Sequence, residues 1–252
     1  MRKLNILVLL CAILMAVPHS ISAQTDVMAL YETGEYDAAV RAAEQLGGSD
    51  NYAIAARALN AVAYFAPDRK SARRAAGRAY EFSKLAIERD PMAVEARLQA
   101  AISMAVRGAN MAPARAFILR LPRRSRRYID EARVLDEQNP WVLSTSAAWH
   151  LEVSRRGGAR VYDADPELGF QECQLARMID PANVVIAYEC ALRLLAFGRG
   201  DWRDEALEAL SASTSGTPKT EFEAAIQRRA FGLEMAIEKS LQAERAFITA
   251  QP

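Results

Sequence analysis

The chain has 252 residues, of which 51% are apolar and 25% charged, and its formal net charge is +1. This composition is typical of a globular protein and excludes disordered, collagen-like and polytopic membrane classes. Because the chain is nearly neutral, it has no global field that attracts nucleic acid or a membrane surface. We therefore expect no nucleic-acid partner, and any electrostatic recognition must be local.

Residues 1–23 have the pattern of a secretory signal peptide. Arg2 and Lys3 precede an apolar run that ends before Pro18, and the small residue Ala23 stands at the expected cleavage position. The apolar run is shorter than the roughly 20 residues that a spanning helix needs. We predict a periplasmic or secreted protein with no stable transmembrane span after cleavage, and an uncleaved membrane anchor is the alternative.

Cleavage would leave two cysteines, Cys173 and Cys190, and one histidine, His150. An exported compartment permits a disulfide between the two cysteines. A chain of this length buries a sufficient core without one, and both residues also suit small buried positions. The sequence leaves a Cys173–Cys190 disulfide open.

The rest of the chain predicts an all-α protein. Its segments are rich in Ala, Leu, Glu and Arg, with apolar residues at helical spacing and no run of alternating β-branched residues. We assign residues 24–217 to one helical domain. Residues 218–252 are expected to form a C-terminal capping helix and tail, with a single long helix from about Pro218 to Phe247.

The helical domain repeats itself. Its second helices are predicted to close at Asp90, Asp136 and Asp180. The helix that follows each of these ends is the first helix of the next pair. An alanine recurs at the same position in the first helices, at Ala61, Ala101, Ala147 and Ala191. Small residues also recur in the second helices, at Ala79, Ser125 and Gly169. Facing small residues let two helix axes approach closely, so this register predicts helix pairs that dock on one another in the same way.

The segment from Tyr31 to Ala39, together with this register, resembles tetratricopeptide repeats. The resemblance covers most of residues 25–212 and implies a right-handed α-solenoid of about five helix hairpins. The period is longer than the family's roughly 34 residues, at 46 from Ala101 to Ala147 and 44 from Ala147 to Ala191. The extra residues fall between the paired helices, so we expect these inserts to emerge on one edge of the solenoid, where loops build binding surfaces.

The inserts carry arginines that predict a basic edge. Positive charge at the start of a helix opposes the helix dipole and is unfavourable for the helix. Its presence there suggests that the arginines serve another purpose, such as binding an acidic segment or a phosphorylated or sulfated group. The alternative is a solvated face neutralised by Asp130, Glu131 and the loop 163–167. The candidate residues of the edge are Arg107, Arg123, Arg124, Arg126, Arg127, Arg155 and Arg156.

A second candidate surface is the concave face, which first helices line in the family that the chain resembles. Helical spacing from the aligned alanines predicts an apolar groove there. Such a groove would take an amphipathic helix or a lipid-like ligand, unless the C-terminal helix folds back over it; we expect that helix to cap the solenoid end instead. The candidate residues of the groove are Phe65, Leu98, Ile102, Trp141, Leu151, Tyr188 and Leu192.

Nothing in the sequence predicts an enzyme. It has no Gly-rich phosphate loop after a strand, no metal-ligand spacing and no catalytic triad. His150 falls at a position where the repeats otherwise place apolar residues, which favours a packed helix-interface role. Asp163, Asp165 and Glu167 are spaced like calcium ligands but lack the required glycine. We predict no catalytic residue, cofactor or metal.

Two functional classes remain. The first is a non-catalytic scaffold of the cell envelope that binds a protein or peptide partner through the groove and the basic edge. The second is an accessory protein of a solute transporter that holds an apolar small molecule or lipid-like ligand, because exported helical-repeat proteins of that kind resemble this layout. The sequence identifies neither partner nor ligand.

Overall fold

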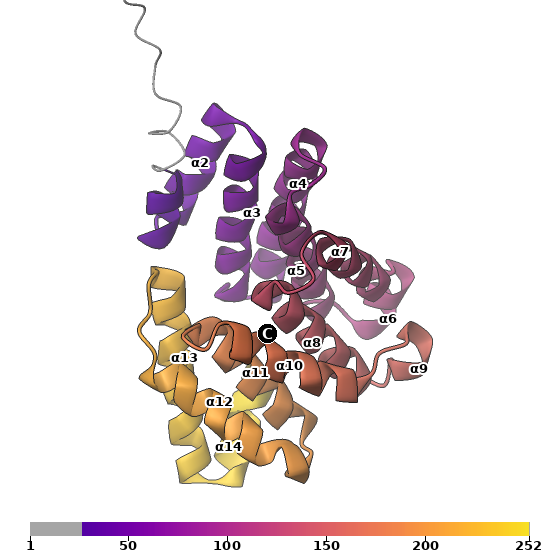
Figure 1. Cartoon of the computed structure of the whole chain (residues 1–252), viewed down its shortest axis with the longest axis vertical. Helices are drawn as coiled ribbons and strands as arrows, with labels where there is room; N and C mark the ends of the chain where they lie inside the picture. Colours follow the sequence, from indigo (N-terminus) through magenta and orange to yellow (C-terminus); the bar gives the residue numbers. More distant parts are fainter. Residues whose placement is uncertain (1–26, 252) are drawn as a thin grey trace, which may run out of the picture.

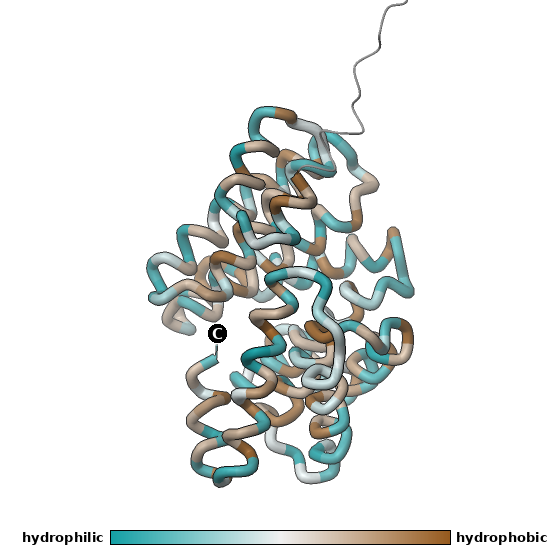
Figure 2. The backbone as a smooth tube through the Cα atoms, turned by 90° about the vertical axis from the view of Figure 1, so that its left-hand side faces the viewer, coloured by the Kyte–Doolittle hydropathy of each residue, from teal (hydrophilic) through white to brown (hydrophobic). Residues whose placement is uncertain are grey.

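The computed structural model describes residues 27–251, so the predicted signal peptide at 1–23 lies outside the described residues. Between residues 27 and 251 all regular structure is helical, with no strand, which confirms the all-α prediction. Within the same range no helix combines the length and apolarity needed to cross a membrane. Apolar and polar residues alternate along the chain (Figure 2), as expected for helices that each bury one face.

After helical residues 27–32, the elements follow one another with short connections. They are α2 (Tyr36–Leu46), α3 (Ser49–Tyr64), α4 (Arg69–Arg89), α5 (Val94–Ala109), α6 (Pro113–Ile118), α7 (Leu121–Leu135), α8 (Pro140–Arg155), α9 (Ala159–Tyr162), α10 (Pro166–Ile179), α11 (Val184–Phe197), the 3-10 turn Gly200–Trp202, α12 (Arg203–Ser215), α13 (Glu221–Lys239) and α14 (Leu241–Ala250).

The predicted helix ends are confirmed at the recurring Asp positions. Asp90, Asp136 and Asp180 are the C-terminal caps of α4, α7 and α10. The side chains of Asn139 and Asn183 each accept two backbone N–H groups at the start of α8 and α11. An Asn side chain at this position satisfies N–H groups that have no partner inside the helix. Local sequence therefore sets the boundaries of these helices.

The helices pack in neighbouring pairs. The most extensive contacts join α3 with α4, α5 with α7, α8 with α10 and α11 with α12. The first helices also contact one another in order, α3 with α5, α5 with α8 and α8 with α11. In Figure 1 the helices of the first half of the chain, in indigo to magenta, lie above those of the second half, in orange to yellow.

Small residues face each other across the pairs, as the register predicts. Ser125 of α7 donates a hydrogen bond of 2.9 Å to the carbonyl oxygen of Ala101 in α5. A β-carbon at Gly169 of α10 would lie only 3.1 Å from the carbonyl oxygen of Ala147 in α8 and 3.0 Å from Cγ of Leu151. Each pair therefore closes to a separation that a larger side chain would prevent.

The inserts form two short helices that meet. α6 lies between the paired helices α5 and α7, and α9 lies between α8 and α10. The ring centroids of Phe117 in α6 and Tyr162 in α9 are 6.3 Å apart in an edge-to-face arrangement. The inserts of two successive pairs thus lie side by side, in agreement with the expectation of a shared edge.

The prediction of one long C-terminal helix is wrong. The segment forms two helices, α13 and α14, which are separated at Ser240. Ser240 has extended backbone angles (φ −179°, ψ 158°), and its side chain accepts the N–H of Ala243. Since a serine that bonds the backbone in this way starts a new helix, the apolar periodicity on either side concealed the break.

The C-terminal helices cover α11 and reach back to α3. Both α13 and α14 contact α11. Phe222, near the start of α13, lies 6.0 Å from the ring of Tyr64 and 5.7 Å from the ring of Phe65 at the end of α3. The segment therefore packs against the last helix pair and also contacts the end of α3.

The predicted groove residues do not form an exposed apolar surface. Leu98, Leu151, Tyr188 and Leu192 are buried in core clusters. Phe65, Ile102 and Trp141 are half-buried and pack against the same clusters. The reason is that each first helix contacts its own partner helix and the first helices of neighbouring pairs. These contacts bury its apolar side chains.

Cys173 and Cys190 are buried free thiols. The sulfur of Cys190 lies 3.8 Å from the carbonyl oxygen of Cys173. Burial raises the pKa of the Cys173 thiol well above its ordinary value, and the neighbouring Cys190 adds to the shift. Both residues thus act as small core side chains in this fold.

The small-residue contact at Gly169 predicts a position-specific loss of stability. Gly169→Val should lower the free energy of unfolding by about 1–3 kcal/mol, because the added methyl groups overlap α8. The matched control is Gly77→Val in α4, where a β-carbon would meet nothing within 4 Å; its effect should stay within about 0.5 kcal/mol. Urea unfolding of both variants measures the difference, and equal effects would contradict the close approach.

The buried thiols predict slow alkylation. Iodoacetamide should leave Cys173 and Cys190 of the folded, signal-free chain unmodified, because the thiolate is the reactive form and burial disfavours it. In denaturant both should react, and intact mass should rise by two carbamidomethyl groups without any reductant. If the intact mass before labelling is lower than that of the free dithiol by two hydrogen atoms, the two cysteines form a disulfide instead.

Candidate functional site

A pocket of about 270 Å³ opens between α7, α8 and α9. We call it the arginine pocket, because α7 contributes three arginines to its wall. It is lined by Arg123, Arg126, Arg127, Asp130, Trp149, Val161, Tyr162 and Asp163. Three of the predicted basic-edge residues are therefore brought together around one cavity, beside two aromatic rings that the prediction had not associated with them.

Arg126 is the arginine that is fixed most firmly. Its Nε lies 2.8 Å from Oδ1 of Asp130, one turn further along α7. One terminal nitrogen lies 3.2 Å from the Ser146 hydroxyl and 2.7 Å from Nε2 of His150, both on α8. The guanidinium also stacks over Trp149 at 5.3 Å. Arg126 thus joins α7 to α8 and forms the rear of the pocket.

The two aromatic residues of the pocket are held by contacts with α7 and with the other insert. Trp149 donates its indole N–H to the carbonyl oxygen of Pro122 at 3.0 Å, which ties α8 to the first turn of α7. Tyr162 packs edge-on against Phe117 of the other insert, and the Arg123 guanidinium lies 6.0 Å from its ring centre. The rings therefore form fixed walls, since each has contacts besides those with the arginines.

Each insert contains a residue with left-handed backbone angles. Arg120, directly before α7, has φ 52°, and Asp163, directly after α9, has φ 56°. Within the described range these are the non-glycine residues with positive φ. This conformation costs a non-glycine residue about 1 kcal/mol or more. Asp163 itself lines the arginine pocket, so the strain lies at the site.

The charges around the pocket are only partly balanced. Arg126 pairs with Asp130, and Arg127 lies 3.4 Å from a carboxylate oxygen of Glu131. Arg123 is exposed and takes part in no ion pair with the residues that the structure describes. The alternative of a neutralised face thus holds for two arginines, whereas Arg123 keeps its positive charge uncompensated.

His150 lies buried behind the pocket, as predicted for a helix-interface residue. Its Nδ1 lies 2.9 Å from the backbone N–H of Asp165, and its Nε2 faces Arg126. Protonation of the imidazole would place a hydrogen on both ring nitrogens, each of which already faces a hydrogen-bond donor. Burial lowers the pKa of His150 to about 4, and the positive charges of Arg126 and Arg133 add to the shift, against an opposing effect of Asp165. The sequence did not indicate this link between the core and the pocket.

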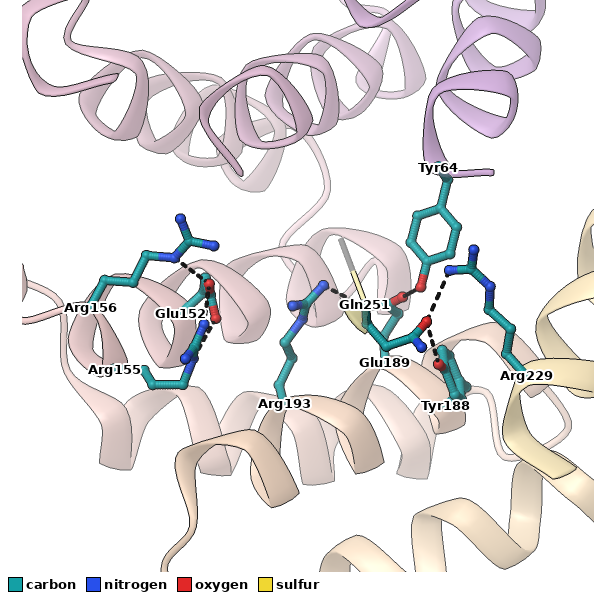
Figure 3. Close-up of polar contacts among 9 residues, drawn as sticks. All are labelled: Tyr64, Glu152, Arg155, Arg156, Tyr188, Glu189, Arg193, Arg229 and Gln251. Carbon is teal, nitrogen blue, oxygen red and sulfur yellow. Dashed lines mark hydrogen bonds and ion pairs between the residues drawn. The ribbon is translucent and has the colours of Figure 1, made fainter. Parts of the chain in front are cut away.

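The other predicted basic-edge residues lie elsewhere. Arg155 and Arg156, at the end of α8, both bind Glu152 (Figure 3). Arg124 donates to the hydroxyl of Tyr80 on α4 at 2.9 Å. Arg107, near the end of α5, lines neither this pocket nor the network around Glu152. The seven residues thus do not form one continuous edge.

A separate polar network joins the two halves of the molecule (Figure 3). The hydroxyl of Tyr64 on α3 lies 2.5 Å from Oε1 of Glu189 on α11, and Glu189 also pairs with Arg193 at 3.0 Å. Arg229 of α13 stacks over Tyr64 at 4.8 Å and donates to Gln251 at 3.1 Å. Burial and the Glu189 carboxylate raise the pKa of Tyr64. The hydroxyl therefore stays protonated and donates to Glu189, which suits a structural contact between the two halves.

An exposed apolar patch borders the arginine pocket. Phe117 and Ile118 of α6 are 57% and 75% exposed, and Leu119 and Val161 are also exposed. We call these four residues the insert patch. Val161 belongs to both surfaces because it also lines the pocket. The run Phe117-Ile118-Leu119 inside an insert was the sequence signal for this patch, and the prediction overlooked it.

No group of three or more His, Cys, Asp or Glu residues within 27–251 could hold a metal ion. Asp165, one of the calcium-like residues, instead caps α10 by accepting the N–H groups of Glu167 and Leu168. The arginine and aromatic side chains of the pocket are of the types that suit an anion.

Comparison with known proteins adds no assignment. No protein-family model matches the chain, and a search of curated proteins also finds no match. The interpretation of the site therefore depends on its geometry.

The buried His150 predicts a specific loss of stability in acid. Its pKa is lower in the folded state than the ordinary 6.5, so the unfolded chain binds the proton first and stability falls as the pH drops from about 6.5 to 4. The full loss is about 3 kcal/mol. His150→Gln should remove this component, as urea unfolding at pH 7, 6, 5 and 4 would show.

The only other histidine, His19, lies in the predicted signal peptide, so the imidazole resonances of the signal-free chain report on His150 alone. An NMR titration midpoint near 6.5 instead of 4 would contradict the proposed environment.

Proposed function

We propose that the chain is a non-catalytic scaffold of the periplasm or cell envelope that binds a protein partner at the arginine pocket and the insert patch. Its architecture is proposed to be a solenoid similar to tetratricopeptide repeats. The recurring small residues, the paired helices and the ordered contacts of the first helices support that similarity. The signal-like residues 1–23 support export.

The observation that carries the proposal is the juxtaposition of an uncompensated arginine with an exposed apolar patch. Partner-binding surfaces are enriched in arginine and aromatic residues, and exposed apolar patches mark such sites. Arg123 and Tyr162 lie on one side of this surface, and Phe117 lies on the other. A scaffold that is otherwise neutral thus concentrates its recognition chemistry at the inserts.

The accessory role in binding an apolar small molecule has less support. Four of the predicted groove residues are buried, and α13 and α14 cover α11. The arginine pocket, at about 270 Å³, is below the roughly 300–1,000 Å³ of sites that enclose a drug-sized ligand. A partner surface that inserts one side chain fits this volume better.

Site-specific photo-crosslinking in the native cells tests the proposal. Benzoylphenylalanine at Ile118 should form an adduct with one partner protein, identified by mass spectrometry. The same probe at Val134, which is 86% exposed and lies near the end of α7, should form none with that partner. Arg123→Glu with Arg127→Glu should reduce the Ile118 adduct at least tenfold, because two attractive charges become repulsive.

The charge control is Arg69→Glu with Arg74→Glu on α4, which changes the net charge by the same amount at exposed positions. It should leave the adduct unchanged. A loss of adduct in both double variants, or equal adducts at positions 118 and 134, would overturn a specific interface at the inserts.

A further inference from the structure

The charge of the arginine pocket matches one carboxylate. Of its three arginines, Arg126 pairs with Asp130 and Arg127 with Glu131, so Arg123 is the one that has no ion pair with a described residue and keeps its single positive charge. A single carboxylate neutralises that charge. A phosphate monoester, at about −1.5 to −2, would exceed it and would face Asp130 and Asp163. The balance of the lining therefore favours an Asp or Glu side chain over a phosphorylated one.

Arg123 is the residue available to bind that carboxylate. Arg126 is committed to Asp130, Ser146 and His150, whereas Arg123 is exposed and makes a cation–π contact with Tyr162. A guanidinium presents two parallel N–H donors to a carboxylate, and the pair is stronger where an aromatic wall excludes water. Arg123 thus supplies the specific contact, whereas Arg126 and Arg127 are already paired with Asp130 and Glu131.

The insert patch lies within reach of a residue adjacent to the bound carboxylate. Val161 lines the pocket and is exposed at its rim, and the rings of Tyr162 and Phe117 are 6.3 Å apart. An extended peptide advances about 3.3 Å per residue. A side chain one to three positions from the acidic residue would therefore reach Phe117, whose neighbour in the chain is the exposed Ile118.

We infer that the arginine pocket and insert patch recognise a short protein segment with one Asp or Glu and a large apolar residue one to three positions away. This inference rests on the proposed function and specifies the partner's chemistry. An anionic membrane surface suits the site less well. Asp130 and Asp163 are exposed at the pocket and would face it, and the chain as a whole is nearly neutral.

Selection from a random peptide library on the immobilised signal-free protein tests this inference. We expect enrichment of an acidic residue followed or preceded, within three positions, by Phe, Leu, Ile, Met or Trp. The enriched peptide, labelled with a fluorophore, should bind in solution by anisotropy. Replacing its acidic residue by Gln or by phosphoserine should weaken binding at least fivefold, and replacing its apolar residue by Ala should do the same.

Variants of the protein identify the contacts. Arg123→Gln should weaken the enriched peptide at least fivefold, and so should Phe117→Ala with Ile118→Ala. Arg69→Gln is the matched charge control on α4 and should have no effect. Circular dichroism and urea unfolding verify that each variant is folded. Because Phe117, Ile118 and Arg123 are exposed, their replacement should alter stability by less than about 0.5 kcal/mol.

Three outcomes would overturn the inference: selection without an acidic residue, tighter binding of the phosphoserine peptide, or binding of vesicles of phosphatidylglycerol and phosphatidylcholine that depends on Arg123 and is not displaced by the peptide. The crosslinking experiment is independent of the library. If a partner protein is crosslinked at Ile118 but no acidic–apolar segment is selected, the scaffold function holds and this inference fails.

Discussion

The close approach of paired helices at small residues is the constraint on which the rest of the structure depends. Gly169 against Ala147 and Ser125 against Ala101 leave no room for a longer side chain between the helix axes. Since these pairs are tight, the residues between their helices cannot be absorbed into the interior. They leave as the inserts that contain α6 and α9. The surface that we propose for partner binding is thus a consequence of the packing of the core.

The inserts are nevertheless held firmly, because polar contacts connect them to the helix pairs. Trp149 bonds the carbonyl oxygen of Pro122, and Arg126 bridges α7 to Ser146 and His150 on α8. The second insert ends at Asp165, whose backbone N–H donates to Nδ1 of His150. One buried imidazole is therefore in contact with both the pocket wall and the start of α10, so the surface that we propose for binding is held in place before a partner arrives.

The C-terminal helices pack against the last helix pair and also make contacts beyond it. Through Phe222 and Arg229 they contact the end of α3, and through Gln251 they contact Tyr188 on α11. Together with the hydrogen bond from Tyr64 on α3 to Glu189 on α11, these contacts join the first and second halves of the chain. The predicted groove residues Leu98, Leu151, Tyr188 and Leu192 are buried by this packing, so the surface that we propose for partner binding lies at the inserts instead.

The sequence by itself determined the helical class, the helix ends at Asp90, Asp136 and Asp180, and the facing of small residues. These features depend on local capping and on a periodicity that each helix carries in its own residues. Only the tertiary structure decided which arginines meet. Arg123, Arg126 and Arg127 line one pocket, whereas Arg155 and Arg156 turn to Glu152. The burial of Tyr188 and the break at Ser240 were also hidden, because they depend on contacts between segments far apart in the chain and on a single side-chain hydrogen bond.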